Sequence, residues 1–186
     1  MKNFVSLDLF SPLNKALKEL KYKTPTPIQA QTIPPAIEGI DILGCAQTGT
    51  GKTAAFALPI LDFIGYEEPR VESKRPVSLI LAPTRELAIQ ISQSFAEYGK
   101  HMQFSHALVY GGVSQNKQVA ALKRGVDVLI ATPGRLCDLM QQKHVFLDNV
   151  EIFVLDEADR MLDMGFLPDL RRIMAALPKK LSLIHI

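Results

Sequence analysis

Residues 46–53 form a glycine-rich segment, Ala-Gln-Thr-Gly-Thr-Gly-Lys-Thr, between an apolar stretch and an alanine-rich one. Residues 40–45 favour a short strand and residues 53–63 a helix, and a strand, a glycine-rich loop and a helix in this order are the context that a phosphate-binding loop requires. The glycines lack the Cβ atoms that would block a tight anion-binding turn, and the helix adds the positive end of its dipole. The strict pattern begins with glycine whereas position 46 is alanine, so an ordinary glycine-rich turn stays open on this segment alone.

A triphosphate with its magnesium ion explains the residue types in this loop. The Lys52 ammonium group can reach the outer phosphates, and the Thr53 hydroxyl can bind Mg²⁺, a hard cation that takes few protein oxygens. The predicted phosphate-binding residues are Gln47, Thr48, Gly49, Thr50, Gly51, Lys52 and Thr53.

Two acidic residues follow a second apolar run. Residues 152–155 have the length and composition of a buried strand, and Asp156 and Glu157 come directly after it. Ligands of open α/β sheets collect at the carboxyl ends of strands, so we predict that Asp156 holds Mg²⁺ and that Glu157 orients the attacking water and accepts its proton. Together with Lys52 they are the predicted catalytic residues. Considered without the loop, the acids could equally stabilise the amino end of a helix.

Composition limits the possible classes of protein. With 186 residues, of which 47% are hydrophobic, the chain has the size of one domain. The net charge of +2 means that nucleic acid would bind to a local patch. The sequence contains neither a membrane-spanning run nor a signal-peptide pattern, and Cys45 and Cys137 are interpreted as small core residues, so a cytoplasmic monomer is expected.

Strand-like and helical patterns alternate along the chain. The first helix has Ser11 as a possible N-cap, and a second begins near Pro27 and turns Ile33 and Ile37 inward. Further strands are predicted at 77–82, 107–110, 126–131 and 152–155, further helices at 86–98 and 115–124, and an exposed loop at 65–76. The alternation predicts an α/β fold, a three-layer sandwich with a mostly parallel sheet and helices on both faces.

Several motifs in a fixed order give the chain a specific resemblance. Thr24-Pro25-Thr26-Pro27-Ile28-Gln29, the phosphate loop, the blocks at 83–88, 111–112 and 132–135, and Asp-Glu-Ala-Asp at 156–159 are similar to the motifs of DEAD-box RNA helicases. Over residues 4 to 180 the chain resembles the first RecA-like domain of this family. The resemblance implies ATP and Mg²⁺ as cofactors, RNA as partner, and ATP hydrolysis coupled to remodelling of RNA duplexes. It divides the chain into a helical segment with the Q motif at 1–40 and a RecA-like ATP-binding domain at 41–180.

The resemblance assigns the Q motif to adenine recognition. Gln29 would read the amino edge of adenine, since an amide offers a donor and an acceptor together. Phe4, Tyr22 and Thr24 would lie near the base. The family usually has glycine where this chain has Lys21.

The resemblance also assigns a set of RNA contacts. The predicted RNA-binding residues are Thr84, Arg85, Gly112, Thr132 and Arg135. Guanidinium, hydroxyl and exposed N–H groups suit a sugar-phosphate backbone and read no base, so we predict sequence-independent binding. From the residues alone, the threonines could instead cap helices and the arginines pair with acids.

The last six residues depart from the family pattern. Family members continue into a strand ending in Ser-Ala-Thr and then into a second RecA-like domain, whereas residues 181–186 read Leu-Ser-Leu-Ile-His-Ile. We interpret the chain as a fragment without the second domain, which binds ATP but does not unwind RNA alone and hydrolyses ATP weakly, because the family's catalytic arginine comes from that domain. Residues 183–186 remain strand-like and are expected to occupy the vacated position in the sheet.

Two other functions remain open. A RecA-like ATPase acting on DNA or protein would share the loop and the acids, and stimulation of ATP hydrolysis by RNA but not by DNA would distinguish the two. A non-enzymatic RNA-binding half-domain would keep its RNA affinity regardless of Lys52.

Overall fold

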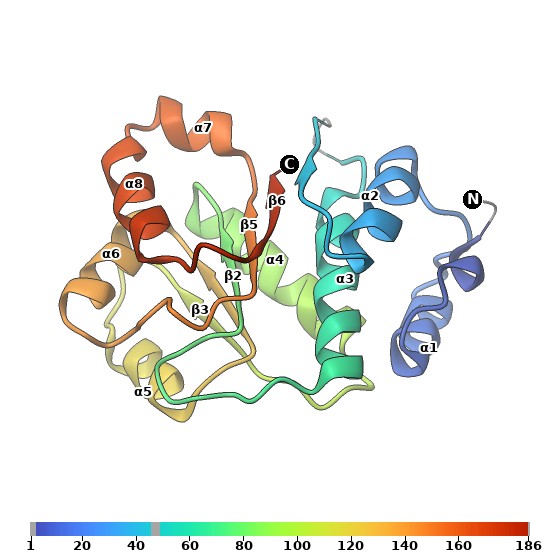
Figure 1. Cartoon of the computed structure of the whole chain (residues 1–186), viewed down its shortest axis with the longest axis horizontal. Helices are drawn as coiled ribbons and strands as arrows, with labels where there is room; N and C mark the ends of the chain where they lie inside the picture. The colour runs from blue at the N-terminus through green and yellow to red at the C-terminus, as the bar shows by residue number, and fades with distance from the viewer. Residues whose placement is uncertain (1–2, 46–48, 186) are drawn as a thin grey trace.

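The computed structural model describes residues 3–45 and 49–185, and a six-stranded sheet runs through its centre (Figure 1). All pairings among the described strands are parallel, and the strand order is β1-β6-β5-β2-β4-β3. The predicted α/β fold with a mostly parallel sheet is confirmed. The strands are β1 (Ile42–Leu43), β2 (Ser78–Leu81), β3 (His106–Val109), β4 (Val128–Ala131), β5 (Ile152–Leu155) and β6 (Ser182–His185).

Helices cover both faces of this sheet, which confirms the three predicted layers. Alternate residues of each central strand serve opposite cores: Ile80 and Val154 belong to one, Leu79 and Phe153 to the other. The first core is closed by a 3₁₀ turn, η1 (Phe4–Leu7), and by α1 (Ser11–Glu19), α2 (Pro27–Ile37), α3 (Lys52–Glu67) and α4 (Arg85–Tyr98). The second is closed by α5 (Asn116–Arg124), α6 (Pro133–Gln141), α7 (Ala158–Asp163) and α8 (Leu167–Ala176).

Burial on both sides explains why the central strands are continuous apolar runs. Every residue of β2, β4 and β5 is buried. In register, Leu79 lies opposite Leu129 and Phe153, so a polar side chain at any of these positions would enter a core. Because the strands are parallel, their carboxyl ends meet at one edge, and the segments that follow them lie side by side.

Three local predictions were wrong. Helix α1 starts at Ser11 with Phe10 as its N-cap, because the Phe10 carbonyl already accepts the Leu13 N–H at 2.8 Å. Ile37 does not turn inward: at the end of α2 it is 40% exposed beside an open cavity. Helix α3 continues to Glu67 instead of ending before Gly65, where the lack of a Cβ lets the Phe10 ring pack closely.

The two cysteines have different environments. Cys137 is buried, as predicted, and burial raises the pKa of its thiol to about 11. Cys45 is exposed, which contradicts its interpretation as a core residue. It follows β1 on the way to the phosphate loop, where the chain leaves the sheet.

The carboxyl-terminal segment lies within the sheet, as the sequence predicted. Strand β6 pairs with both β1 and β5, with Ile184 opposite Ile42 and Val154. The Leu183 N–H also donates to the Asp41 carboxylate at 2.8 Å.

No helix within the described ranges is long and apolar enough to cross a membrane.

Lys21 occupies the left-handed region, with φ of 61°, directly after α1. This conformation costs a residue with a Cβ roughly 1–2 kcal/mol and costs glycine little. We expect Lys21→Gly to raise the free energy of unfolding by about 1 kcal/mol, measured by urea denaturation. Lys23→Gly is the matched control: Lys23 is exposed and is not among the residues with positive φ, so there the added chain entropy should destabilise. Equal effects of the two changes would contradict the argument.

Candidate functional site

The phosphate loop joins β1 to α3, and both of its described glycines have left-handed backbones. Gly49 has φ of 82°, and Gly51, the N-cap of α3, has φ of 88°. A Cβ at Gly51 would lie 2.4 Å from Gln29 Nε2, so both the turn and this contact require glycine. Thr50 and Thr53 lie within the described residues, whereas Gln47 and Thr48 lie outside them. The amide groups at the start of α3 are thus of the kind that can bind an anion at a helix end.

Lys52 and Glu157 reach one cavity although they are far apart in sequence. Lys52 is the first residue of α3, and Asp156 follows β5. Asp156 directly precedes Glu157 in the chain; burial raises the pKa of Asp156, and the Lys52 charge opposes that rise. Lys52 and Glu157 line one cavity of about 870 Å³, together with Gly44, Cys45 and Asp159.

Asp156 has the environment of a metal ligand. It is only 2% exposed, and its Oδ1 atom accepts no hydrogen bond from any described residue. Burial raises the pKa of Asp156 to about 6, the Lys52 charge opposes this shift, and the Glu157 charge adds to it. A buried carboxylate oxygen without a partner is rare, and an oxygen-seeking cation would satisfy it. The buried Asp156 oxygen therefore fits Mg²⁺, and the Thr53 hydroxyl, at the second residue of α3, could supply another oxygen.

Glu157 occupies an unusual backbone conformation. Its φ of 55° and ψ of 50° are left-handed, and it is the N-cap of α7. Its Oε2 atom accepts a hydrogen bond from Arg160 Nη1 at 3.1 Å, which holds the carboxylate at the cavity wall. A left-handed residue other than glycine is often found at functional sites, where the surrounding structure compensates its cost.

Gln29 connects the Q motif with the phosphate loop. It is 2% exposed; its Oε1 accepts the Thr26 N–H at 3.0 Å, and its Nε2 donates to the Gly51 carbonyl at 3.1 Å. These bonds use one lone pair and one N–H of the amide and leave one of each for a ligand. A cavity of about 490 Å³ adjoins Gln29, lined also by Tyr22, Thr24 and Gly49.

The aromatic residues of the Q motif pack against each other. Phe4 is buried and meets the Tyr22 ring edge to face at 5.6 Å, and the Tyr22 hydroxyl is 3.0 Å from the Tyr98 hydroxyl. Phe4 does not line the cavity beside Gln29, whereas Tyr22 does. Phe4 therefore packs against Tyr22 without lining the cavity itself.

The predicted RNA-binding residues lie after β2, β3 and β4, at the same edge of the sheet. Arg85 is exposed with its guanidinium 4.8 Å from the centre of the Tyr110 ring, and Arg135 donates to the Val113 carbonyl at 3.1 Å. Within the described residues, neither arginine forms an ion pair with an acid. Gly112 is exposed, with φ of 80°.

The capping alternative for the threonines holds in part. The Thr84 hydroxyl accepts the Leu87 N–H at 3.2 Å and caps α4. Thr132 is the N-cap residue of α6 but makes no capping bond with its side chain. The Thr132 hydroxyl is therefore the freer of the two.

Comparison with known proteins decides the family. A model of the DEAD/DEAH box helicase family matches residues 26–185, most of the chain. The chain belongs to the DEAD/DEAH box helicase family. It is 44% identical over 179 residues to DEAD-box ATP-dependent RNA helicase CshA of Bacillus cereus, covering 96% of this chain and 33% of that protein. It is 44% identical over 177 residues to ATP-dependent RNA helicase DeaD of Mycobacterium tuberculosis (95% and 31%) and 51% identical over 154 residues to probable ATP-dependent RNA helicase ddx17 of Dictyostelium discoideum (83% and 20%).

The chain spans about a third of the length of CshA and of DeaD, and a fifth of the length of ddx17.

Two features of this family member were not predicted from its sequence. One is the Glu157–Arg160 ion pair, for which the spacing of three residues at the start of a helix was an available signal. The other is the bond from Gln29 to Gly51, which no sequence pattern indicates.

Proposed function

We propose that this chain is the ATP-binding part of an ATP-dependent RNA helicase. The observation that supports this most directly is that Lys52 lines one cavity with Glu157, whose chain neighbour Asp156 has a buried, unpartnered oxygen, while the same loop is bonded to Gln29. A cation, a metal-ligating oxygen and an adenine-matching amide around one loop fit the three parts of Mg-ATP.

The phosphates lie at the amino end of α3 in this proposal. The N–H groups of residues 49–53 donate to the phosphate oxygens, and the Lys52 ammonium group neutralises the outer ones. Mg²⁺, held by Thr53 and Asp156, supplies further neutralisation of the phosphate charge. At neutral pH, Asp156 with a pKa of about 6 is mostly ionised, as a metal ligand must be.

Glu157 is the residue that handles the attacking water. Its carboxylate lines the same cavity as Lys52, and the hydrogen bond from Arg160 to Oε2 leaves Oε1 to accept a proton from water. Because the left-handed backbone at Glu157 sets the direction of its side chain, the carboxylate is positioned before nucleotide arrives.

RNA would lie along the edge formed by the segments after β2, β3 and β4. Arg85, Arg135, the Thr132 hydroxyl and the Gly112 N–H offer donors without a preference for any base, so we propose sequence-independent contact with the sugar-phosphate backbone. Such binding should weaken steeply as salt increases.

Nucleotide titration tests the adenine assignment. We expect wild-type protein to bind ATP at least tenfold more tightly than GTP, because the Gln29 amide matches the donor and acceptor pattern of adenine but not that of guanine. Gln29→Glu removes the amide donor at nearly constant size and should lower ATP affinity about tenfold, read by fluorescent-nucleotide displacement. The exposed Gln90→Glu on α4 is the control and should change nothing. Equal affinity for ATP and GTP in the wild type would contradict the assignment.

A further inference from the structure

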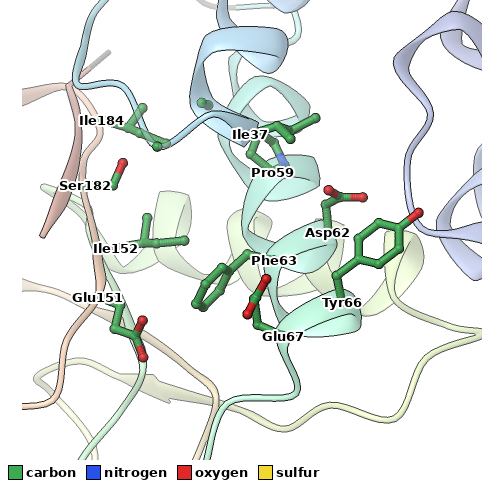
Figure 2. A pocket seen from close by; sticks show the side chains of 12 residues that line it. Ile37, Pro59, Asp62, Phe63, Tyr66, Glu67, Glu151, Ile152, Ser182 and Ile184 are labelled. Atoms are coloured by element: carbon green, nitrogen blue, oxygen red, sulfur yellow. The ribbon is translucent and has the colours of Figure 1, made fainter.

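A further cavity lies at the opposite end of the sheet from the nucleotide site. It measures about 490 Å³, within the range of ligand pockets, and lies where β5 and β6 begin (Figure 2). Its walls come from the end of α2, the second half of α3 and the first residues of the two strands. We call it the amino-end cavity and define it by Ile37, Phe63, Tyr66, Glu67, Glu151 and Ile152.

Large apolar side chains are exposed at the amino-end cavity. Ile37 is 40% exposed and Tyr66 58% exposed, although both side chains are large. Tyr66 has a fixed place, since the Phe10 ring meets it edge to face at 5.3 Å. Phe63 and Ile152 form the interior, and Figure 2 shows both side chains extending into the hollow. An apolar side chain entering it would therefore meet a formed surface.

Negative charge surrounds this apolar surface. Glu67 and Glu151 are exposed, and neither takes part in an ion pair among the described residues. Figure 2 shows their carboxylates on either side of the Phe63 ring. The carboxyl end of α3, with its negative dipole end, lies at Glu67. Two cations, Arg70 and Lys180, line a neighbouring hollow together with Glu151, and Arg70 pairs with Glu72 at 4.0 Å.

A third carboxylate in the wall is already engaged. Asp62 is buried and accepts the Phe10 N–H at 2.6 Å, and burial raises its pKa. It fixes the amino-terminal segment to α3, so Tyr66 and its partner Phe10 stay in place. The charges free to meet a ligand are those of Glu67 and Glu151.

We propose that the amino-end cavity binds a short segment of a partner protein in which an apolar side chain is flanked by Lys or Arg. The apolar side chain enters between Phe63 and Ile152, and the flanking cations reach Glu67 and Glu151. Nucleic acid does not fit, because its phosphates would face two unpaired carboxylates. The site is independent of the nucleotide site, which lies beyond the other end of α3.

Synthetic peptides provide the test. The probe is fluorescein-labelled Gly-Ser-Lys-Leu-Phe-Arg-Ser-Gly, with two matched peptides: one has Glu in place of Lys and Arg, and the other has Ser in place of Leu and Phe. We expect fluorescence anisotropy to show saturable binding of the first peptide below 1 mM, and at least tenfold weaker binding of the other two. Amide shifts in ¹⁵N-resolved NMR spectra should cluster at residues 37–39, 62–67 and 151–152.

Variants locate the site. Glu67→Lys combined with Glu151→Lys should weaken the first peptide at least tenfold and improve the Glu-containing peptide. Glu97→Lys, at an exposed position on α4, is the matched control and should leave both affinities unchanged. ATP affinity should be the same in all of these proteins. Absence of binding at 1 mM, equal binding of the three peptides, or shifts outside the named residues would each overturn the proposal.

Discussion

Replacing Lys52 by alanine is expected to lower the affinity for Mg-ATP about 100-fold, the largest effect on nucleotide binding that we predict for a single change. An ammonium group bound to phosphate is worth roughly 2–3 kcal/mol, and this is the lysine at the end of the phosphate loop. The change also acts through the metal ligand. Because the Lys52 charge opposes the rise in the pKa of Asp156, its loss raises that pKa further, and a smaller fraction of Asp156 is then ionised to hold Mg²⁺.

Isothermal titration calorimetry with a nonhydrolysable ATP analogue and Mg²⁺ measures this effect. Lys123→Ala, at an exposed position in the last turn of α5, is the control for loss of a lysine and should retain wild-type affinity. Circular dichroism of both variants checks that the fold is kept. If Lys52→Ala bound the analogue as tightly as wild type while RNA affinity was also unchanged, the chain would be an RNA-binding module instead of a nucleotide-dependent one.

Glu157→Gln should reduce the rate of ATP hydrolysis about 100-fold to 1,000-fold and leave ATP affinity within about threefold of wild type. The amide keeps the size of the side chain and accepts a hydrogen bond from Arg160, but it takes no proton from water at neutral pH. The two effects therefore separate a role in the chemical step from a role in binding. Lys52→Ala, in contrast, should affect both.

Single-turnover hydrolysis of radiolabelled ATP with protein in excess measures rates that are too slow for steady-state assays. Saturating single-stranded RNA is present throughout, and Glu97→Gln on α4 serves as the control for the isosteric change. A Glu157→Gln protein that hydrolysed ATP at the wild-type rate would show that Glu157 does not accept the proton. The same rate combined with weaker binding would indicate a purely structural role at the start of α7.

Much of the fold could be predicted because the central strands record their burial on both faces. Residues 152–155 were predicted as a strand and form β5 with the same limits, because a short run with β-branched and aromatic residues favours a buried strand. Boundaries at the surface were less predictable. Ser11 was predicted as the N-cap and Ile37 as a core residue from local preference. In the structure the Phe10 carbonyl accepts the first helical hydrogen bond, and Ile37 lines the cavity beside α2.

The sequence also predicted the strand ends at which the candidate functional residues lie. The segments after β1, β2, β3, β4 and β5 hold every predicted phosphate, metal and RNA residue outside the Q motif, and parallel strands must bring these segments to one edge. Side-chain partners could not be read in this way. That Arg160 bonds Glu157, and that Arg85 lies over Tyr110, depends on rotamers and neighbouring elements.

By itself the sequence determined the layers, the parallel sheet and the family, because each burial pattern and each motif is recorded in a short stretch of the chain. Only the tertiary structure decided that Asp156 keeps an unpartnered buried oxygen, that Lys52 and Glu157 line one cavity, that Gln29 bonds Gly51, and that the amino-end cavity opens between α3 and β5. These features join residues that are distant in sequence. Their chemistry follows from packing and desolvation, which arise when the elements come together.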